Sequence, residues 1–221
     1  MKKFFALLLL PSIAFAGKIG ENYVSAQVGF ADVGVELMDA KVTWDGFAFE
    51  LAGNVAVVTE ESYGLDLHLS LLHAPSLEGP VSSEADVTFL NGLARPYIHL
   101  GSSKFFANLA FSNASWEING VSLLDETEFS PGLGIEFSFD KLTIAPSIDY
   151  VNYGEGTPLG NGVTWEDGKA LIYTIPVSFQ YSEKVDVTFK YEIADFEELS
   201  FNGLKNSYLY DSVMLGIDYK F

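Results

Sequence analysis

Apolar and polar side chains alternate with a period of two after residue 17, and helical periodicity is nearly absent. The stretch 24–30, for example, places Val24, Val28 and Phe30 on one face and Ser25 and Gln27 on the other. Because successive side chains of a strand point to opposite faces, this pattern predicts an all-β fold. The stretches that alternate are 24–30, 47–57, 65–71, 94–100, 105–112, 133–139, 142–150, 171–181, 185–193 and 213–221.

The connections between these ten stretches alternate in length. Short turns are predicted at 59–62, 101–104, 140–141 and 182–184, and longer loops near 33–43, 74–91, 117–128, 154–168 and 199–207. Short turns at one end and long loops at the other are typical of an antiparallel up-and-down transmembrane β-barrel. Ten strands are favoured. Eight remain the alternative, because Pro96, Pro131, Pro146 and Pro176 lie in or beside four of the stretches, where a missing N–H breaks the ladder.

The two faces of the predicted strands differ in size as well as polarity. The apolar face carries no charge and is rich in Phe, Leu, Ile and Tyr, whereas the opposite face combines glycine, alanine and small polar residues with a few charges. A water-soluble barrel or sandwich would need its bulky face inside and a densely charged face outside. The observed faces instead favour bulky side chains against lipid and a narrow polar lumen.

The first sixteen residues predict a secretory signal peptide. Lys2 and Lys3 precede the apolar run 4–10, and Ala14-Phe15-Ala16 has the small residues of a cleavage site. Residues 17–221 would then form the barrel.

The whole chain has a formal charge of −18, which becomes −20 when the two lysines are removed. A chain this acidic excludes nucleic acid as a partner, and the lack of cysteine excludes disulfides and thiolate chemistry.

The last predicted strand carries a family resemblance. Its outward residues, Val213, Leu215, Ile217, Tyr219 and Phe221, resemble the C-terminal assembly signal of outer-membrane β-barrels. With the signal peptide, the chain resembles the small outer-membrane β-barrel superfamily, which includes porin family proteins and the transmembrane domain of outer membrane protein A. The resemblance implies location in a Gram-negative outer membrane. It also implies periplasmic chaperones and the barrel assembly machinery as partners.

Charged and histidine side chains on the inward face form the candidate functional site. Charges enclosed in a narrow lumen are costly unless they are paired, so a salt-bridged plug is favoured over an open polar conduit or a catalytic cluster. Arg95, the only arginine, is expected to bridge two carboxylates through its planar fork. The predicted lumen polar network is Glu50, Asp66, His68, Arg95, His99, Glu136, Asp149, Lys190 and Glu192, with Asp218 on the same face.

An enzyme is the least favoured class. Asp66-Leu67-His68 has the D-x-H spacing of omptin proteases, but the acidic D-x-D pair that omptins also need is missing. His99 and Ser102 do not make a convincing lipid hydrolase site, and two histidines are a weak basis for a metal site. The sequence therefore predicts no catalytic residue, no metal and no cofactor.

The predicted outer loops are acidic, whereas Lys104, Lys141 and Lys184 lie in the predicted periplasmic turns. Acidic loops keep a chain soluble, and they can also bridge to lipopolysaccharide phosphates through divalent cations. Taken together, the sequence predicts a porin-like or structural barrel. A narrow cation-preferring channel is the alternative, and an outer-membrane hydrolase is a distant third. The acidic loop residues are Asp39, Asp45, Glu78, Glu84, Asp86, Asp125, Glu126, Glu128, Glu166, Asp167, Glu197 and Glu198.

Overall fold

The computed structural model describes residues 18–37, 40–79, 84–118, 121–153, 168–196, 199–201 and 204–221. The predicted signal peptide, 1–16, lies outside these residues. The described chain consists of β-strands joined by turns. The strands are β1 (Tyr23–Leu37), β2 (Ala40–Thr59), β3 (Tyr63–Glu78), β4 (Glu84–Leu100), β5 (Ser103–Ile118), β6 (Val121–Phe139), β7 (Leu142–Ile144), β8 (Ser147–Tyr153), β9 (Gly168–Gln180), β10 (Val185–Phe196), β11 (Leu199–Phe201) and β12 (Leu204–Lys220).

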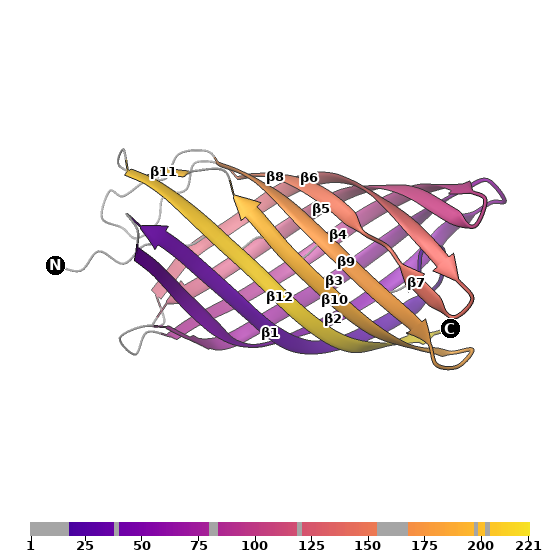
Figure 1. Cartoon of the computed structure of the whole chain (residues 1–221), viewed down its shortest axis with the longest axis horizontal. Helices are drawn as coiled ribbons and strands as arrows, with labels where there is room; N and C mark the ends of the chain where they lie inside the picture. Colours follow the sequence, from indigo (N-terminus) through magenta and orange to yellow (C-terminus); the bar gives the residue numbers. More distant parts are fainter. Residues whose placement is uncertain are drawn as a thin grey trace.

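The strands form one closed antiparallel barrel, in which β1 pairs with both β2 and β12. β7 and β8 occupy the same place between β6 and β9 and act as one broken strand. The short β11 is an additional strand on the edge of β12. The wall therefore has ten strands, which run obliquely to the long axis (Figure 1). The predicted ten-strand barrel is confirmed, and the eight-strand alternative is wrong.

The four short turns gather at one end of the barrel, together with the C-terminus (Figure 1). Lys18–Asn22 also lies at this end, where the backbone N–H of Phe221 donates to the carbonyl of Asn22 at 3.3 Å. By the usual orientation of bacterial barrels, short turns mark the periplasmic side. We call this end the periplasmic mouth.

The predicted long loops are wrong in four of five places, because strands continue through most of them. β1 extends to Leu37 and β2 begins at Ala40, so most of 33–43 is a hairpin that continues the ladder. Strands likewise enter 74–91, 117–128 and 199–207. Strand pairing continues there after the apolar alternation has stopped, because the ladder between two strands is made of backbone hydrogen bonds and does not require apolar side chains. The fifth predicted loop, 154–168, lies outside the described residues except for Gly168, which begins β9.

The prolines that cast doubt on the strand boundaries have different effects. Pro96, Pro131 and Pro176 remain inside continuous strands, opposite partners on a neighbouring strand. Pro146 instead lies in the gap between β7 and β8. Two backbone hydrogen bonds of 3.1 Å span this gap, from Ile135 to Pro146 and from Ala145 to Pro176. They hold the broken strand in the wall.

The outer face of the barrel is apolar. Large hydrophobic side chains on every strand of the wall except the short β7 are exposed, such as Leu69 at 58% and Leu215 at 57%. The inner face is polar and buried, as the predicted alternation requires. An exposed apolar surface of this extent is far larger than soluble monomers tolerate. None of the described residues belongs to a helix that is long and apolar enough to cross a membrane.

Candidate functional site

The lumen contains the charged side chains that the sequence places on the inward face. All except His99 are at most 5% exposed, although the strands that carry them are spread around the barrel. Arg95 and Lys190 are the only buried cations among the described side chains, whereas seven carboxylates are buried with them. The buried carboxylates are those of Glu50, Asp66, Glu136, Asp149, Asp186, Glu192 and Asp218.

Lys190 forms the most enclosed ion pair of the lumen. Its Nζ lies 2.5 Å from Oε2 of Glu50, and the two side chains are 0% and 1% exposed. β12 and β1 separate the strands that carry them, β10 and β2. The bridge therefore spans part of the lumen, rather than joining neighbouring strands along the wall. Glu192, which follows on β10, accepts a hydrogen bond from Thr174 Oγ1 at 3.3 Å.

Arg95 begins a second polar chain that crosses three strands. Its Nε donates to Oδ1 of Asn108 at 3.1 Å, and Nδ2 of Asn108 donates to Oδ1 of Asp149 at 2.8 Å. The guanidinium lies over the ring of Phe106, 4.9 Å from its centre. Asp66 faces Arg95 directly in the pairing of β3 with β4. Arg95 is thus connected to Asp149 through Asn108, a contact that the sequence did not predict.

The two predicted lumen histidines are not brought together. The register places His68 opposite Leu93, whereas His99 lies six residues further along β4, beside the short turn. His68 is buried near Tyr23, with ring centres 6.3 Å apart. His99 is half-buried and meets Tyr97 edge to face at 5.6 Å. Within the described part of the chain, no three His, Asp or Glu side chains gather closely enough to hold a metal ion.

A short segment before β1 enters the lumen, which the alternation of apolar and polar residues did not predict. Ile19 is 1% exposed and packs with Tyr97, Phe106 and Ala145. Its backbone N–H donates to Oε2 of Glu136 at 2.7 Å, and the N–H of Gly20 donates to Oδ2 of Asp66 at 2.8 Å. Two acids of the predicted network therefore bind the chain's own backbone.

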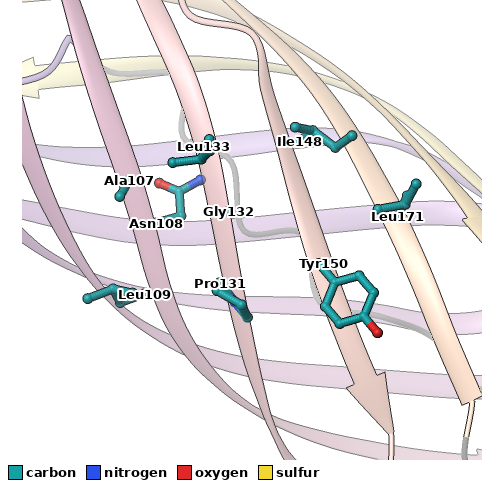
Figure 2. A pocket seen from close by; sticks show the side chains of 9 residues that line it. All are labelled: Ala107, Asn108, Leu109, Pro131, Gly132, Leu133, Ile148, Tyr150 and Leu171. Atoms are coloured by element: carbon teal, nitrogen blue, oxygen red, sulfur yellow. The ribbon is translucent and has the colours of Figure 1, made fainter.

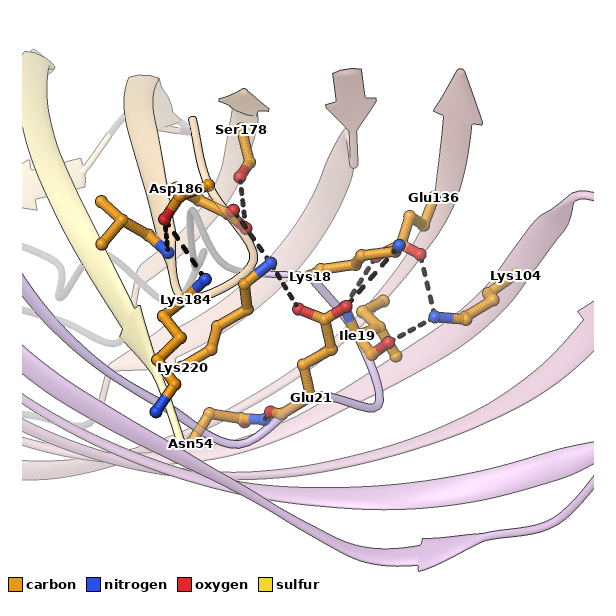
Figure 3. Close-up of polar contacts among 12 residues, drawn as sticks. Lys18, Ile19, Glu21, Asn54, Lys104, Glu136, Ser178, Lys184, Asp186 and Lys220 are labelled. Atoms are coloured by element: carbon orange, nitrogen blue, oxygen red, sulfur yellow. Dashed lines mark hydrogen bonds and ion pairs between the residues drawn. The ribbon is translucent and has the colours of Figure 1, made fainter. Parts of the chain in front are cut away.

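Ion pairs surround this segment at the periplasmic mouth, as Figure 3 shows. Lys104 Nζ lies 3.1 Å from Oε1 of Glu136 and also donates to the carbonyl of Ile19. Lys220 Nζ lies 3.5 Å from Glu21 and 3.0 Å from Asp186. Asp186 is nearly buried and had not been included in the predicted network.

Sequence comparisons give no family: no family model matches, and no curated protein matches. The fold, however, resembles many solved structures. An outer membrane channel from Pseudomonas putida F1 superposes with a TM-score of 0.62 at 9% identity, over 96% of this chain and 100% of that one. The outer membrane protease OmpT from Escherichia coli gives 0.53 at 8% identity, over 95% and 100%. The translocator domain of the autotransporter NalP from Neisseria meningitidis gives 0.52 at 12% identity, over 95% and 91%.

The chain has the fold of an outer-membrane β-barrel. The exposed apolar face of this barrel independently indicates a membrane, because it requires lipid around it. The protein is therefore a barrel of the Gram-negative outer membrane. A channel, a protease and a translocator share this fold, so the fold does not assign an activity.

The residues of the predicted assembly signal lie on the lipid-facing side of the barrel. Val213, Leu215, Ile217, Tyr219 and Phe221 are 44–69% exposed. β12, which carries all but the last of them, also closes the barrel by pairing with β1. Their recognition by the assembly machinery stays a prediction.

The outer wall of the barrel has a groove of about 450 Å³ where β5, β6, β8 and β9 meet (Figure 2). Leu109, Leu133, Ile148 and Leu171 line it, with Pro131 and Gly132 at its centre. Among the described pairs between β6 and β8, none involves residues 130 and 131, which lie between Phe129 and Gly132. The groove is almost wholly apolar and faces outward, so it offers acyl chains a surface.

Proposed function

We propose that the protein is a porin-like structural barrel of the outer membrane, without catalytic activity, whose lumen is closed by paired charges. The Lys190–Glu50 bridge carries the proposal, because it spans part of the lumen and is almost completely enclosed. An open channel would leave such groups in contact with water. The chain from Arg95 through Asn108 to Asp149 and the segment at Ile19 support the same conclusion.

Purified barrel reconstituted into planar lipid bilayers is expected to give no steady single-channel steps. Several side chains that would line a pore bind one another: Lys190 binds Glu50, and Asn108 links Arg95 to Asp149. Insertion must be checked separately, by recovering folded barrel from the same lipid as a band that shifts on boiling. Reproducible steps from barrel that has been purified from a strain without native porins would contradict a closed lumen.

A cation-preferring channel is the second candidate, and the excess of buried acid favours it. Seven carboxylates against two cations would give any water-filled path a negative potential. If conductance steps do appear, a salt gradient distinguishes this candidate. The reversal potential should then approach the Nernst potential of the cation in that gradient.

A protease or hydrolase has less support. Asp66, the acid of the predicted D-x-H pair, accepts a hydrogen bond from Gly20 near the periplasmic mouth. His68 is only 5% exposed on the same strand. A substrate would have to displace the segment at Ile19 before it could reach this pair. We therefore assign these residues to the structure of the lumen.

Lipopolysaccharide, bridged by divalent cations, is the proposed partner of the outer rim. Asp45, Glu78 and Glu84 lie opposite one another on β2, β3 and β4, and all three are exposed. Like charges placed directly across strands destabilise a sheet unless cations screen them. The remaining acids of the predicted loops have no described side chains, except Asp86, which is exposed and accepts from the backbone N–H of Ser76 at 2.6 Å.

A further inference from the structure

We propose that the periplasmic mouth is a peptide-binding site and that Lys18–Asn22 is its tethered ligand. The ligand is a peptide in which isoleucine is followed by a glycine that makes a turn. This proposal goes beyond a closed lumen and does not depend on it, since the site can bind its peptide whether or not the rest of the lumen conducts ions.

The site binds the peptide first through its backbone. Glu136 on β6 accepts from the N–H of Ile19, and Lys104 on β5 donates to the carbonyl of the same residue. Asp66 on β3 accepts from the N–H of Gly20. Asn54 on β2 donates from Nδ2 to the carbonyl of Glu21 at 2.8 Å. Four strands thus supply four side chains to backbone groups of three consecutive residues, which a simple lead-in to β1 would not need.

A side-chain pocket adds selectivity for isoleucine. Ile19 fills an apolar space formed by Tyr97, Phe106 and Ala145. Burying an isoleucine side chain fully stabilises a complex, because its apolar surface is removed from water. A smaller or polar residue in its place would lose that contribution and would leave the pocket underfilled.

Glycine is required at the next position for two reasons. Gly20 has φ +82°, a conformation that favours glycine, and a Cβ atom there would lie 2.8 Å from the hydroxyl oxygen of Tyr97. Proline is incompatible with this φ and would also remove the N–H that Asp66 binds. Gly20→Pro is therefore the variant expected to expel the segment without changing the site.

Polar groups at the periplasmic mouth bind the last two residues of the segment, Glu21 and Asn22. Lys220 and Lys18 lie 3.5 and 3.6 Å from the two carboxylate oxygens of Glu21. Oδ1 of Asn22 accepts from the N–H of Ala56 at 2.8 Å. These contacts connect the segment to β2 and to the end of β12, next to Phe221.

The test uses a fluorescent synthetic peptide, Gly-Lys-Ile-Gly-Glu-Asn, and barrel that lacks residues 18–22. The peptide should bind this barrel saturably in fluorescence anisotropy. Binding to the full chain should be at least tenfold weaker, because the tethered segment occupies the site. A peptide with serine in place of isoleucine is the matched control and should also bind at least tenfold more weakly. Equal binding to both barrels, or equal binding of both peptides, would overturn the proposal.

A second measurement covers the case in which the shortened barrel fails to fold. The chain contains no cysteine, so a thiol reagent reports on one introduced site. In folded barrel, Ile19→Cys should react at least tenfold more slowly than Lys18→Cys, whose native side chain is about one third exposed. Adding Gly20→Pro to Ile19→Cys should abolish that protection. If Ile19→Cys reacts as fast as Lys18→Cys in the folded full chain, the segment does not occupy the site and the proposal fails.

Discussion

Replacing Lys190 with methionine is expected to lower the free energy of unfolding of the barrel by about 3–5 kcal/mol. Methionine fills similar space but leaves the Glu50 carboxylate enclosed without its ammonium partner at 2.5 Å. Urea unfolding in lipid vesicles, followed by the mobility of unboiled samples in gel electrophoresis, measures the change.

The matched control for this prediction is the double variant Lys190→Met/Glu50→Gln. It removes both charges and nearly keeps the volume, and such replacements are often neutral. Most of the lost stability should therefore return. If Lys190→Met alone is as stable as the native barrel, or if the double variant is no more stable than the single one, the bridge does not close the lumen as proposed.

Replacing Leu69 with arginine is expected to lower the stability of the barrel by about 2–4 kcal/mol, the range for a cationic side chain on the lipid face near the bilayer midplane. Leu69 lies on the outer face near the centre of the membrane-spanning part of β3 and is 58% exposed. In water an exposed substitution of this kind changes stability by only about 0.5 kcal/mol. The same urea titration distinguishes the two environments.

Glu61→Arg provides the comparison for this variant. Glu61 is exposed in the short turn before β3 and lies beyond the apolar face. Arginine there should leave the midpoint of unfolding nearly unchanged. Equal and small effects at both positions would argue that water, not lipid, surrounds Leu69.

The strands and their orientation could be predicted from the sequence because one physical pattern specifies both. A period of two sets the inward and outward faces, and bulky residues such as Phe111 and Leu133 show which face meets lipid. Shifting a strand by one residue would expose Glu136 to acyl chains, so the register has little freedom. This is why ten strands and their faces follow from local sequence.

The extent of the strands could not be read in the same way. Beyond the membrane, the ladder between β1 and β2 continues to Leu37 and Ala40 without any need for apolar alternation. The break at Pro146 and the continuity at Pro176 also depend on neighbouring strands, which supply hydrogen bonds around each proline. These outcomes are set by pairing partners distant in sequence.

For the lumen, the sequence predicted which charged side chains face inward, but it did not predict which of them contact one another. Lys190 and Glu50 are 140 residues apart and meet only because the barrel closes between β1 and β12. Arg95 contacts Asn108, an uncharged neighbour that charge patterning does not single out. The segment at Ile19 is too short to show a period, so its burial follows only from the fold.

Spin labels at neighbouring positions of β3 test the central claim most directly, because the native chain has no cysteine. Labels introduced by Leu67→Cys and Leu69→Cys should collide readily with oxygen dissolved in lipid and hardly with a water-soluble nickel complex. A label introduced by Ser70→Cys, on the buried face, should collide with oxygen much less. The reverse order, with Ser70→Cys meeting lipid and the leucine positions enclosed, would contradict a barrel whose bulky face is in the membrane.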